Sequence, residues 1–211
     1  EVDEEVRRER LKQLWDRYGN GAIALALIIV IAIGGWRAYQ WWEAKKAAEA
    51  GAQFEAALKL SSEGKHEEAE AAFEKLASQG TAGYRTLARF RAAEELSKRD
   101  PQAAVRVYDA LAADAHIGQT LQDLAAIRAG LVLVDTVPYG ELRSRLELLT
   151  AEDRPFRHTA RELLALSAWR AGDGAAVKHW VDILMTDAGT PADIRNRVEM
   201  LSTLTGGTEK G

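Results

Sequence analysis

The first feature of the chain is a long uncharged run near its start. From Tyr18 to Trp36 no residue carries a charge. Arg17 and Arg37 close this run on either side, and residues 22–33 at its centre are Ala, Leu, Ile and Val alone. At a helical rise of about 1.5 Å per residue the run is about 28 Å long, close to the hydrocarbon thickness of a bilayer. The pattern predicts a transmembrane helix.

Aromatic side chains flank the apolar run on both sides, as they do in membrane-interface belts. We expect six of them to anchor the helix: Trp15, Tyr18, Trp36, Tyr39, Trp41 and Trp42. A cleaved signal peptide would have a shorter apolar core followed by small residues. A core helix of a soluble protein is rarely apolar on every face over this length. The predicted membrane helix with its aromatic flanks therefore covers residues 18–42.

Basic residues around the run predict its orientation. Five of them precede the run within residues 1–17, and three follow it within residues 37–46. Because Lys and Arg are enriched on the cytoplasmic side, the tail at residues 1–17 is predicted to be cytoplasmic. The larger C-terminal part would then lie in the periplasm of a bacterial cell. We interpret the tail as a solvated helical extension, with a cytoplasmic docking helix as the alternative.

The apolar positions after about residue 43 recur with the period of a helix, and no segment is a convincing strand. A Gly turn at Gly64 is followed by acidic residues, then by a small residue, an aromatic and a leucine. The same three positions return 35 residues later. A small residue lets a neighbouring helix approach and the aromatic fills the layer between helices, so we expect packing at Ala69, Phe73, Leu76, Ala104, Tyr108 and Leu111. A period near 34 predicts helix–turn–helix repeats.

Two further units are less regular. A pair of helices is expected over residues 119–135 and from Pro138 onward. After Gly172 the pattern returns in one of two registers, which differ by one residue. In the first, Ala176 and Trp180 take the small and aromatic positions. In the second, Val177 and Val181 take them.

The last predicted helix has a plainer pattern. Thr190 is the expected N-cap and Pro191 the first helical residue. The expected buried face consists of Ile194, Val198, Leu201 and Leu204. Such a helix commonly seals the open end of a repeat stack. The predicted repeat domain covers residues 43–205, and residues 206–211 are predicted to be a disordered tail.

The composition excludes several kinds of chemistry. The chain has no cysteine, which rules out disulfides, zinc–thiolate sites and thiol nucleophiles. A formal net charge of −4 argues against nucleic-acid binding. No two histidines have the spacing of zinc ligands on a helix, and His158 with Glu162 is interpreted as a surface ion pair. Arg85 and Arg89 share a helix face, which we interpret as solvated rather than as a site for an acidic peptide. We therefore expect no enzyme activity, no cofactor, no metal and no small-molecule substrate.

The segments Trp15–Gly19 and Gly64–Ala69, with Phe73, carry a resemblance to a known family. Together with the architecture of tail, single membrane helix and helical repeats, they resemble the YfgM-like family, the ancillary subunit of the bacterial SecYEG translocon. The repeats themselves resemble tetratricopeptide repeats. The composition, with four prolines and abundant Ala, Leu, Glu and Arg, predicts an all-α chain. The resemblance implies an inner-membrane protein with a stack of about three to four helix pairs. It also implies protein partners, namely the translocon, a PpiD-like chaperone and proteins that emerge into the periplasm.

Two other functions fit the same features. The first alternative is an accessory single-pass subunit of another inner-membrane complex, such as a respiratory one, in which the membrane helix itself binds the partner. Small residues within the apolar run, including Ala24, Gly34 and Gly35, would allow such packing. The second alternative is a scaffold for envelope or cytochrome assembly, a role in which such repeats also occur. All three hypotheses share a non-enzymatic protein that contacts the lipid bilayer and other proteins.

Overall fold

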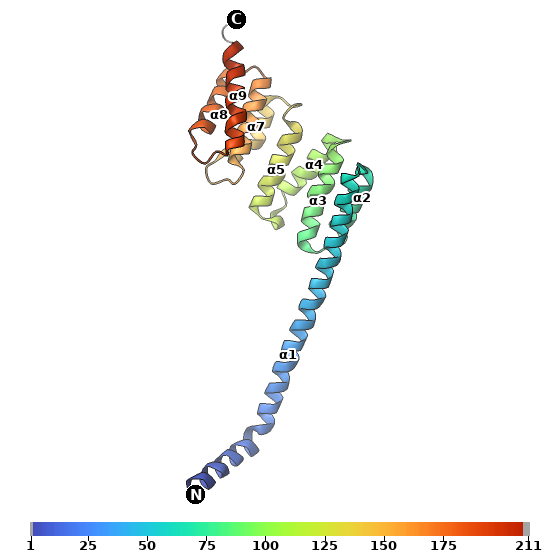
Figure 1. The fold of residues 1–211 in the computed structure, drawn as a ribbon, viewed down its shortest axis with the longest axis vertical. Coiled ribbons are helices and arrows are strands. Elements are labelled where there is room, and N and C mark those ends of the chain that lie inside the picture. Colours follow the sequence, from blue (N-terminus) through green and yellow to red (C-terminus); the bar gives the residue numbers. More distant parts are fainter. Residues whose placement is uncertain (1, 209–211) are drawn as a thin grey trace. The chain divides into compact units, whose positions relative to one another are not determined.

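The computed structural model describes the backbone of residues 2–208 and the side chains of residues 15–204, other than residues 16, 22 and 26. In this part every regular element is helical (Figure 1). The helices are α1 (Val2–Ser62), α2 (His66–Gln79), α3 (Ala82–Ser97), α4 (Pro101–Ala112), α5 (Gln119–Leu133), α6 (Tyr139–Leu146), α7 (Arg157–Arg170), α8 (Gly174–Thr186) and α9 (Ala192–Thr208), with short 3-10 turns η1 (Ala115–Ile117) and η2 (Glu147–Thr150). The predicted all-α class is confirmed.

The chain divides into two compact units, Glu1–Ala52 and Gln53–Gly211, and the division falls within α1. The large apolar side chains described between Trp15 and Trp42 are open rather than packed, with exposed fractions from 49% at Ile29 to 71% at Ile31. By length and composition this helix can cross a membrane, because its most apolar 18-residue window has a mean hydropathy of 2.0. A contiguous apolar surface of this kind marks a site of contact with lipid or protein.

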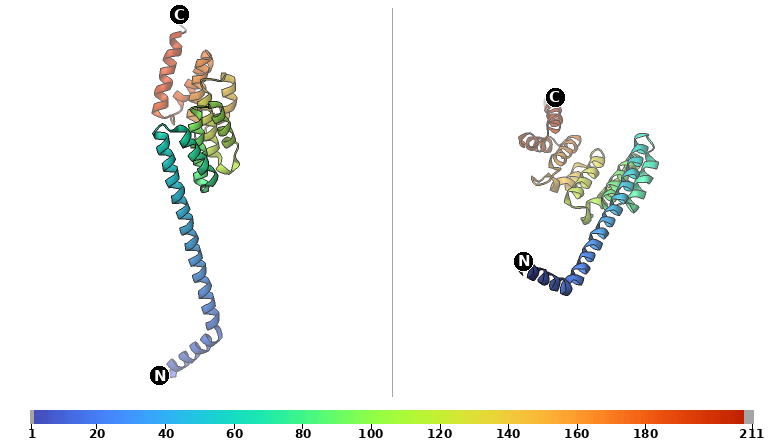
Figure 2. Two further views of the ribbon diagram at one scale, coloured as in Figure 1. Left: turned by 90° about the vertical axis from the view of Figure 1, so that its right-hand side faces the viewer. Right: turned by 60° about the horizontal axis from the view of Figure 1, so that its bottom comes forward.

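The second unit is a series of paired helices that follow one another in chain order, as Figure 2 also shows. The end of α1 pairs with α2, and the rings of Phe54 and Phe73 lie edge to face with 5.4 Å between their centroids. The next pairs are α3 with α4, α5 with α6 and α7 with α8, and α9 packs against α7 and α8. The described residues thus form four pairs and a closing helix, where about three to four pairs were expected.

Local chemistry explains where the second helix of a pair begins. Gly64 takes a φ of +79°, which only glycine adopts without strain, and it makes the turn before α2. The Asp100 side chain accepts a hydrogen bond of 2.9 Å from the Ala103 backbone N–H at the start of α4. Asp173 caps α8 in the same way through the Ala176 N–H, also at 2.9 Å. These caps satisfy backbone donors that the first turn of a helix leaves unpaired.

The second helices bury the same three positions in each pair. Those of α2 and α4 are Ala69, Phe73, Leu76, Ala104, Tyr108 and Leu111, all between 0% and 3% exposed. Equivalent residues of the later pairs are also buried, namely Leu142, Leu146, Leu149, Val177, Val181 and Leu184. The structure therefore selects the register with Val177 and Val181. Trp180 is buried beside them, and its Nε1 donates a hydrogen bond of 2.9 Å to the Tyr139 hydroxyl.

A small residue in each first helix allows the pair to close. It lies twelve positions before the first buried residue of the second helix and is Ala57, Ala92, Gly130 or Ala165 in the successive pairs. At Gly130 an added methyl group would stand only 2.9 Å from Cδ1 of Leu146. The absence of a side chain thus lets α5 and α6 approach each other closely.

The last helix differs from the prediction at several points. Ile194, Val198 and Leu201 are buried as expected, but Leu204 is 53% exposed. The Thr190 hydroxyl is buried and has no hydrogen-bond partner among the described residues, so it does not cap α9. The backbone of α9 continues to Thr208, past the predicted start of a disordered tail at residue 206. Residues 209–211 lie outside the described residues.

Candidate interaction surfaces

Apolar side chains recur on the first helices of the pairs. The second helices α4, α6 and α8 have their N-cap residues at positions 100, 138 and 173. In each of these pairs, the residues seven and four positions before the N-cap are apolar. The same two positions recur in α9, 35 residues after those of α7. We call this set the apolar stripe: Ala93, Leu96, Leu131, Val134, Leu166, Trp169, Leu201 and Leu204. Because equivalent positions of stacked repeats face the same side, the stripe crosses successive helices of the unit.

Several members of the stripe lie on the surface rather than in the core. The exposed fractions are 46% for Leu131, 39% for Leu166, 46% for Trp169 and 53% for Leu204. Isolated exposed leucines are ordinary on protein surfaces, whereas exposed apolar side chains that lie side by side form a patch suited to a partner. Exposed tryptophan is also enriched where proteins bind one another. The stripe is therefore the candidate protein-binding surface.

A pocket of about 340 Å³ lies at the α3 end of the stripe. Ala92, Ala93 and Leu96 of α3 line it together with Ala77 of α2 and Val107 of α4. Small alanine side chains on two helices leave the space open. The mainly apolar lining is suited to an apolar side chain from a partner.

Polar residues also border this pocket, and Arg89 is one of them. The sequence pattern indicated that Arg89 is solvated, but the structure places it in an ion pair. Arg89 Nη1 donates a hydrogen bond of 2.7 Å to Asp114 Oδ2. This bond, with those from His116, lowers the pKa of Asp114 to about 2. Arg89 is therefore engaged within the repeat domain. Arg85 is exposed and has no side-chain ion pair among the described residues.

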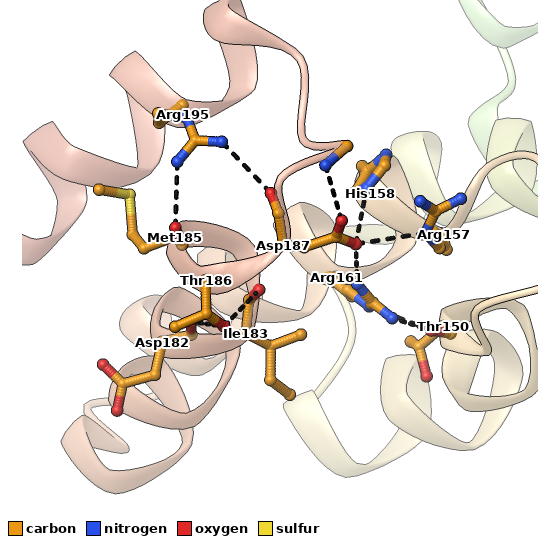
Figure 3. Close-up of polar contacts among 11 residues, drawn as sticks. Thr150, Arg157, His158, Arg161, Asp182, Ile183, Met185, Thr186, Asp187 and Arg195 are labelled. Carbon is orange, nitrogen blue, oxygen red and sulfur yellow. Dashed lines mark hydrogen bonds and ion pairs between the residues drawn. The ribbon is translucent and has the colours of Figure 1, made fainter.

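An ion-pair cluster joins α7 to the loop between α8 and α9 (Figure 3). The Asp187 carboxylate accepts hydrogen bonds from the Gly189 backbone N–H at 2.9 Å and from Arg161 Nη1 at 3.0 Å. His158 Nε2 and Arg157 Nε lie 3.0 Å and 3.3 Å from the same carboxylate. The Gly189 bond, followed by that with His158, holds the pKa of Asp187 well below its usual range. The cluster fixes the position of α7, which carries Leu166 and Trp169.

The predicted pairing of His158 with Glu162 is wrong. Glu162 instead accepts hydrogen bonds from Arg197 of α9, with 2.5 Å to Nε and 3.0 Å to Nη2. These contacts raise the pKa of Arg197 above its usual value. His158 and Glu162 of α7 thus each make an ion pair with a residue distant in the sequence. The partner of His158 is Asp187, at the end of α8, and that of Glu162 is Arg197 of α9. Among the described residues, no group of His, Asp and Glu side chains is arranged to hold a metal ion.

Replacement of Asp187 by asparagine should remove part of the acid sensitivity of the fold. A folded-state pKa below the ordinary value of about 3.9 means that the unfolded chain binds the proton first. The stabilisation is therefore present above about pH 4 and is lost as the pH falls further. We expect urea unfolding followed by tryptophan fluorescence to show a shallower loss of stability between about pH 5 and about pH 3 in Asp187→Asn than in the parent protein. The control is Asp182→Asn, which removes an exposed carboxylate; an unchanged slope in Asp187→Asn would contradict the assignment.

The six predicted anchoring aromatics all lie on α1, and each is at least half exposed: Trp15, Tyr18, Trp36, Tyr39, Trp41 and Trp42. Basic side chains lie over three of the rings. Arg17 Cζ is 5.8 Å from the Tyr18 ring centroid. After the apolar run, Lys46 Nζ lies 3.4 Å from the centroid of a Trp42 ring and Lys45 Nζ 5.7 Å from that of Trp41. The four-residue spacing of these Lys–Trp pairs was a signal in the sequence that our prediction did not use.

Paired helices at a regular period, small residues at their crossings and a closing helix define a helical-repeat protein. A family profile described as a tetratricopeptide repeat-like domain matches residues 12–163, and the chain belongs to this family. The match includes the apolar part of α1 as well as the first three helix pairs. No curated protein and no solved structure matched the chain. Domains of this kind are generally modules that bind other proteins.

Proposed function

We propose that this chain is a single-pass membrane protein whose repeat domain binds protein partners along the apolar stripe. The exposed row of Leu131, Leu166 and Trp169 at equivalent repeat positions is the observation that carries the proposal. These side chains gain from leaving water when a partner covers them. The pocket beside Ala93 provides a place for an apolar anchor residue of the partner.

The proposed membrane anchor is the apolar part of α1. Its described aliphatic side chains are exposed, and rings with nearby cations stand at both ends of the apolar run. A lipid bilayer would cover the aliphatic surface and hold the rings at its interfaces. The family match extends through this segment, which supports its being part of the family's architecture.

We further propose that the partners are the SecYEG translocon and a PpiD-like chaperone, and that the repeat domain lies in the periplasm of a bacterial cell. The resemblance of the whole architecture to the YfgM-like family supports this role. The excess of Lys and Arg before the apolar run supports a cytoplasmic N-terminus. A tethered repeat domain needs only weak contacts to emerging proteins, because tethering raises their effective concentration.

Site-specific photo-crosslinking in native membranes tests this proposal. A crosslinker is introduced at Leu131 in the full chain and in a variant with Leu166→Ser and Trp169→Ser. We expect the parent chain to capture the translocon or the chaperone, and the double variant to lose about tenfold or more of the product, because two apolar contacts of about 1–2 kcal/mol each are removed. The control is Leu148→Ser, which changes an exposed leucine outside the stripe. Equal capture by the double variant, or capture of cytoplasmic proteins alone, would contradict the proposal.

The accessory-subunit hypothesis is favoured by a separate observation on α1. Gly34 and Gly35 are exposed, and apart from the adjacent residues and the backbone of α1 itself nothing lies within 4 Å of the position of an added Cβ. Such a surface allows a second membrane helix to approach closely. Exchange of residues 18–36 for an unrelated membrane helix separates the two functions in the same crosslinking assay. An adaptor would keep its crosslinks from Leu131, whereas an accessory subunit would lose its association.

A further inference from the structure

The segment that follows the apolar run carries basic and aromatic side chains in a regular arrangement. Arg37, Trp41 and Lys45 are spaced by four residues, so they share one face of α1. Trp42 and Lys46 repeat the arrangement on the adjacent face, with the ammonium group 3.4 Å from a ring centroid. We call the set of Trp36, Arg37, Trp41, Trp42, Lys45 and Lys46 the lysine–tryptophan belt.

The cations of this belt are not neutralised by acidic side chains. Arg37, Lys45 and Lys46 have no carboxylate within ion-pair distance among the described residues. Glu43, the acidic residue between them, accepts a hydrogen bond of 3.0 Å from the Tyr39 hydroxyl. A lysine over an aromatic face keeps N–H donors for another ligand, because the ring contacts only one side of the ammonium group. The belt therefore presents three exposed positive charges that have no ion-pair partner among the described residues and are free to bind an external anion.

The geometry of a helix brings these charges back toward the apolar run. Side chains on an α-helix lean toward its N-terminus, and the apolar run lies on the N-terminal side of the belt. The stacking of Lys45 on Trp41 and of Lys46 on Trp42 shows this direction, since each ring belongs to the preceding turn. The ammonium groups therefore lie nearer to the end of the apolar run than their own Cα atoms do. The anions at that depth of a bilayer are the phosphates of lipid headgroups.

We propose that the lysine–tryptophan belt binds the phosphate groups of anionic phospholipids. This inference rests on the proposed membrane anchoring of α1. Three cations without acidic partners favour lipids with net negative charge over zwitterionic lipids, whose own ammonium group offsets the phosphate. The tryptophan rings fix the lysine side chains, which lowers the entropy lost when a phosphate is bound. The belt thus selects a lipid neighbour at one end of the membrane helix.

The test measures lipid selectivity of the full chain in reconstituted bilayers. The bilayers are phosphatidylcholine with a minor fraction of phosphatidylglycerol, and one of the two lipids carries a spin label. Electron spin resonance separates lipids at the protein surface from free lipids and gives the relative association constant. We expect phosphatidylglycerol to be favoured about threefold over phosphatidylcholine. At about 1 M salt, where the Debye length is about 3 Å, the preference should fall toward one.

Two double variants make the test specific to the belt. Lys45→Gln with Lys46→Gln should remove most of the preference for phosphatidylglycerol. Lys59→Gln with Lys75→Gln removes the same charge from exposed positions outside the belt and should retain the preference. A parent chain without preference, or a preference that survives in the Lys45/Lys46 variant, would overturn the proposal. Extraction of the parent chain by alkaline carbonate would instead overturn the membrane anchoring on which the proposal rests.

Discussion

Replacement of Phe73 by alanine is expected to lower the free energy of unfolding of the repeat domain by about 3–5 kcal/mol. The Phe73 side chain is fully buried, and its ring packs edge to face with that of Phe54. Phe54 in turn lies 5.9 Å from the Tyr84 ring, so three helices meet at this cluster. Truncation to alanine removes the ring contacts and leaves a cavity that the surrounding helices fill only partly. Urea unfolding of the full chain in detergent, followed by circular dichroism, measures the change.

The loss should be local before it becomes global. Repeat proteins gain stability from contacts between neighbouring repeats, so damage to the first pair leaves distant pairs folded at first. Hydrogen exchange of Phe73→Ala should therefore show early loss of protection in α2 and the end of α1, with α7 and α8 still protected. Leu148→Ala is the control, because Leu148 is 77% exposed and its truncation should change stability by less than about 0.5 kcal/mol. A small effect at Phe73 would contradict the packing role of its ring, and a uniform loss of protection would contradict the local unfolding expected of stacked repeats.

Introduction of two arginines at Ile28 and Ile29 should abolish membrane integration. Both isoleucines lie near the middle of the apolar run and are exposed in the structure. An arginine at the centre of a membrane helix costs about 2.5–3.5 kcal/mol, whereas an isoleucine favours insertion by about 0.3–0.6 kcal/mol. The double substitution therefore opposes insertion by about 6–8 kcal/mol. We expect the variant to appear in the soluble fraction after an alkaline carbonate wash, while the parent chain remains in the pellet.

The matched control for this experiment replaces the same two residues by alanine. Alanine is close to neutral for insertion, so Ile28→Ala with Ile29→Ala should change the insertion energy by only about 1 kcal/mol and remain in the pellet. Retention of the arginine variant in the pellet would mean that a protein contact, rather than lipid, covers this part of α1. Release of the alanine control would mean that the anchor is weaker than its composition indicates.

Much of the fold could be predicted from residues that interact within one turn of a helix. The Gly turn before α2 and the cap at Asp100 are local signals, as is the spacing of Ala69 and Phe73 in α2. The uncharged run needs only composition and length to be recognised. Such signals depend on neighbours in sequence, and helical periodicity displays them directly.

The candidate binding surface was harder to predict, because it depends on which helix faces remain uncovered. Leu131 and Leu166 have the pattern of core residues in the sequence, yet each is more than one-third exposed in the structure. The prediction counted Leu204 among the buried residues of the last helix, and the structure places it on the surface. A leucine signals a buried face only if a neighbouring helix covers that face.

The amino-acid sequence by itself determined the all-helical class, the apolar run with its aromatic flanks and the repeat period. Each of these follows from the composition or from the spacing of residues along the chain, without knowledge of which helices pack together. Only the tertiary structure decided between Val177 and Ala176 as the repeat position, and paired His158 with Asp187 across 29 residues. Packing decided both, since burial and ion pairing depend on the residues that the stacking of helices brings together from distant parts of the chain.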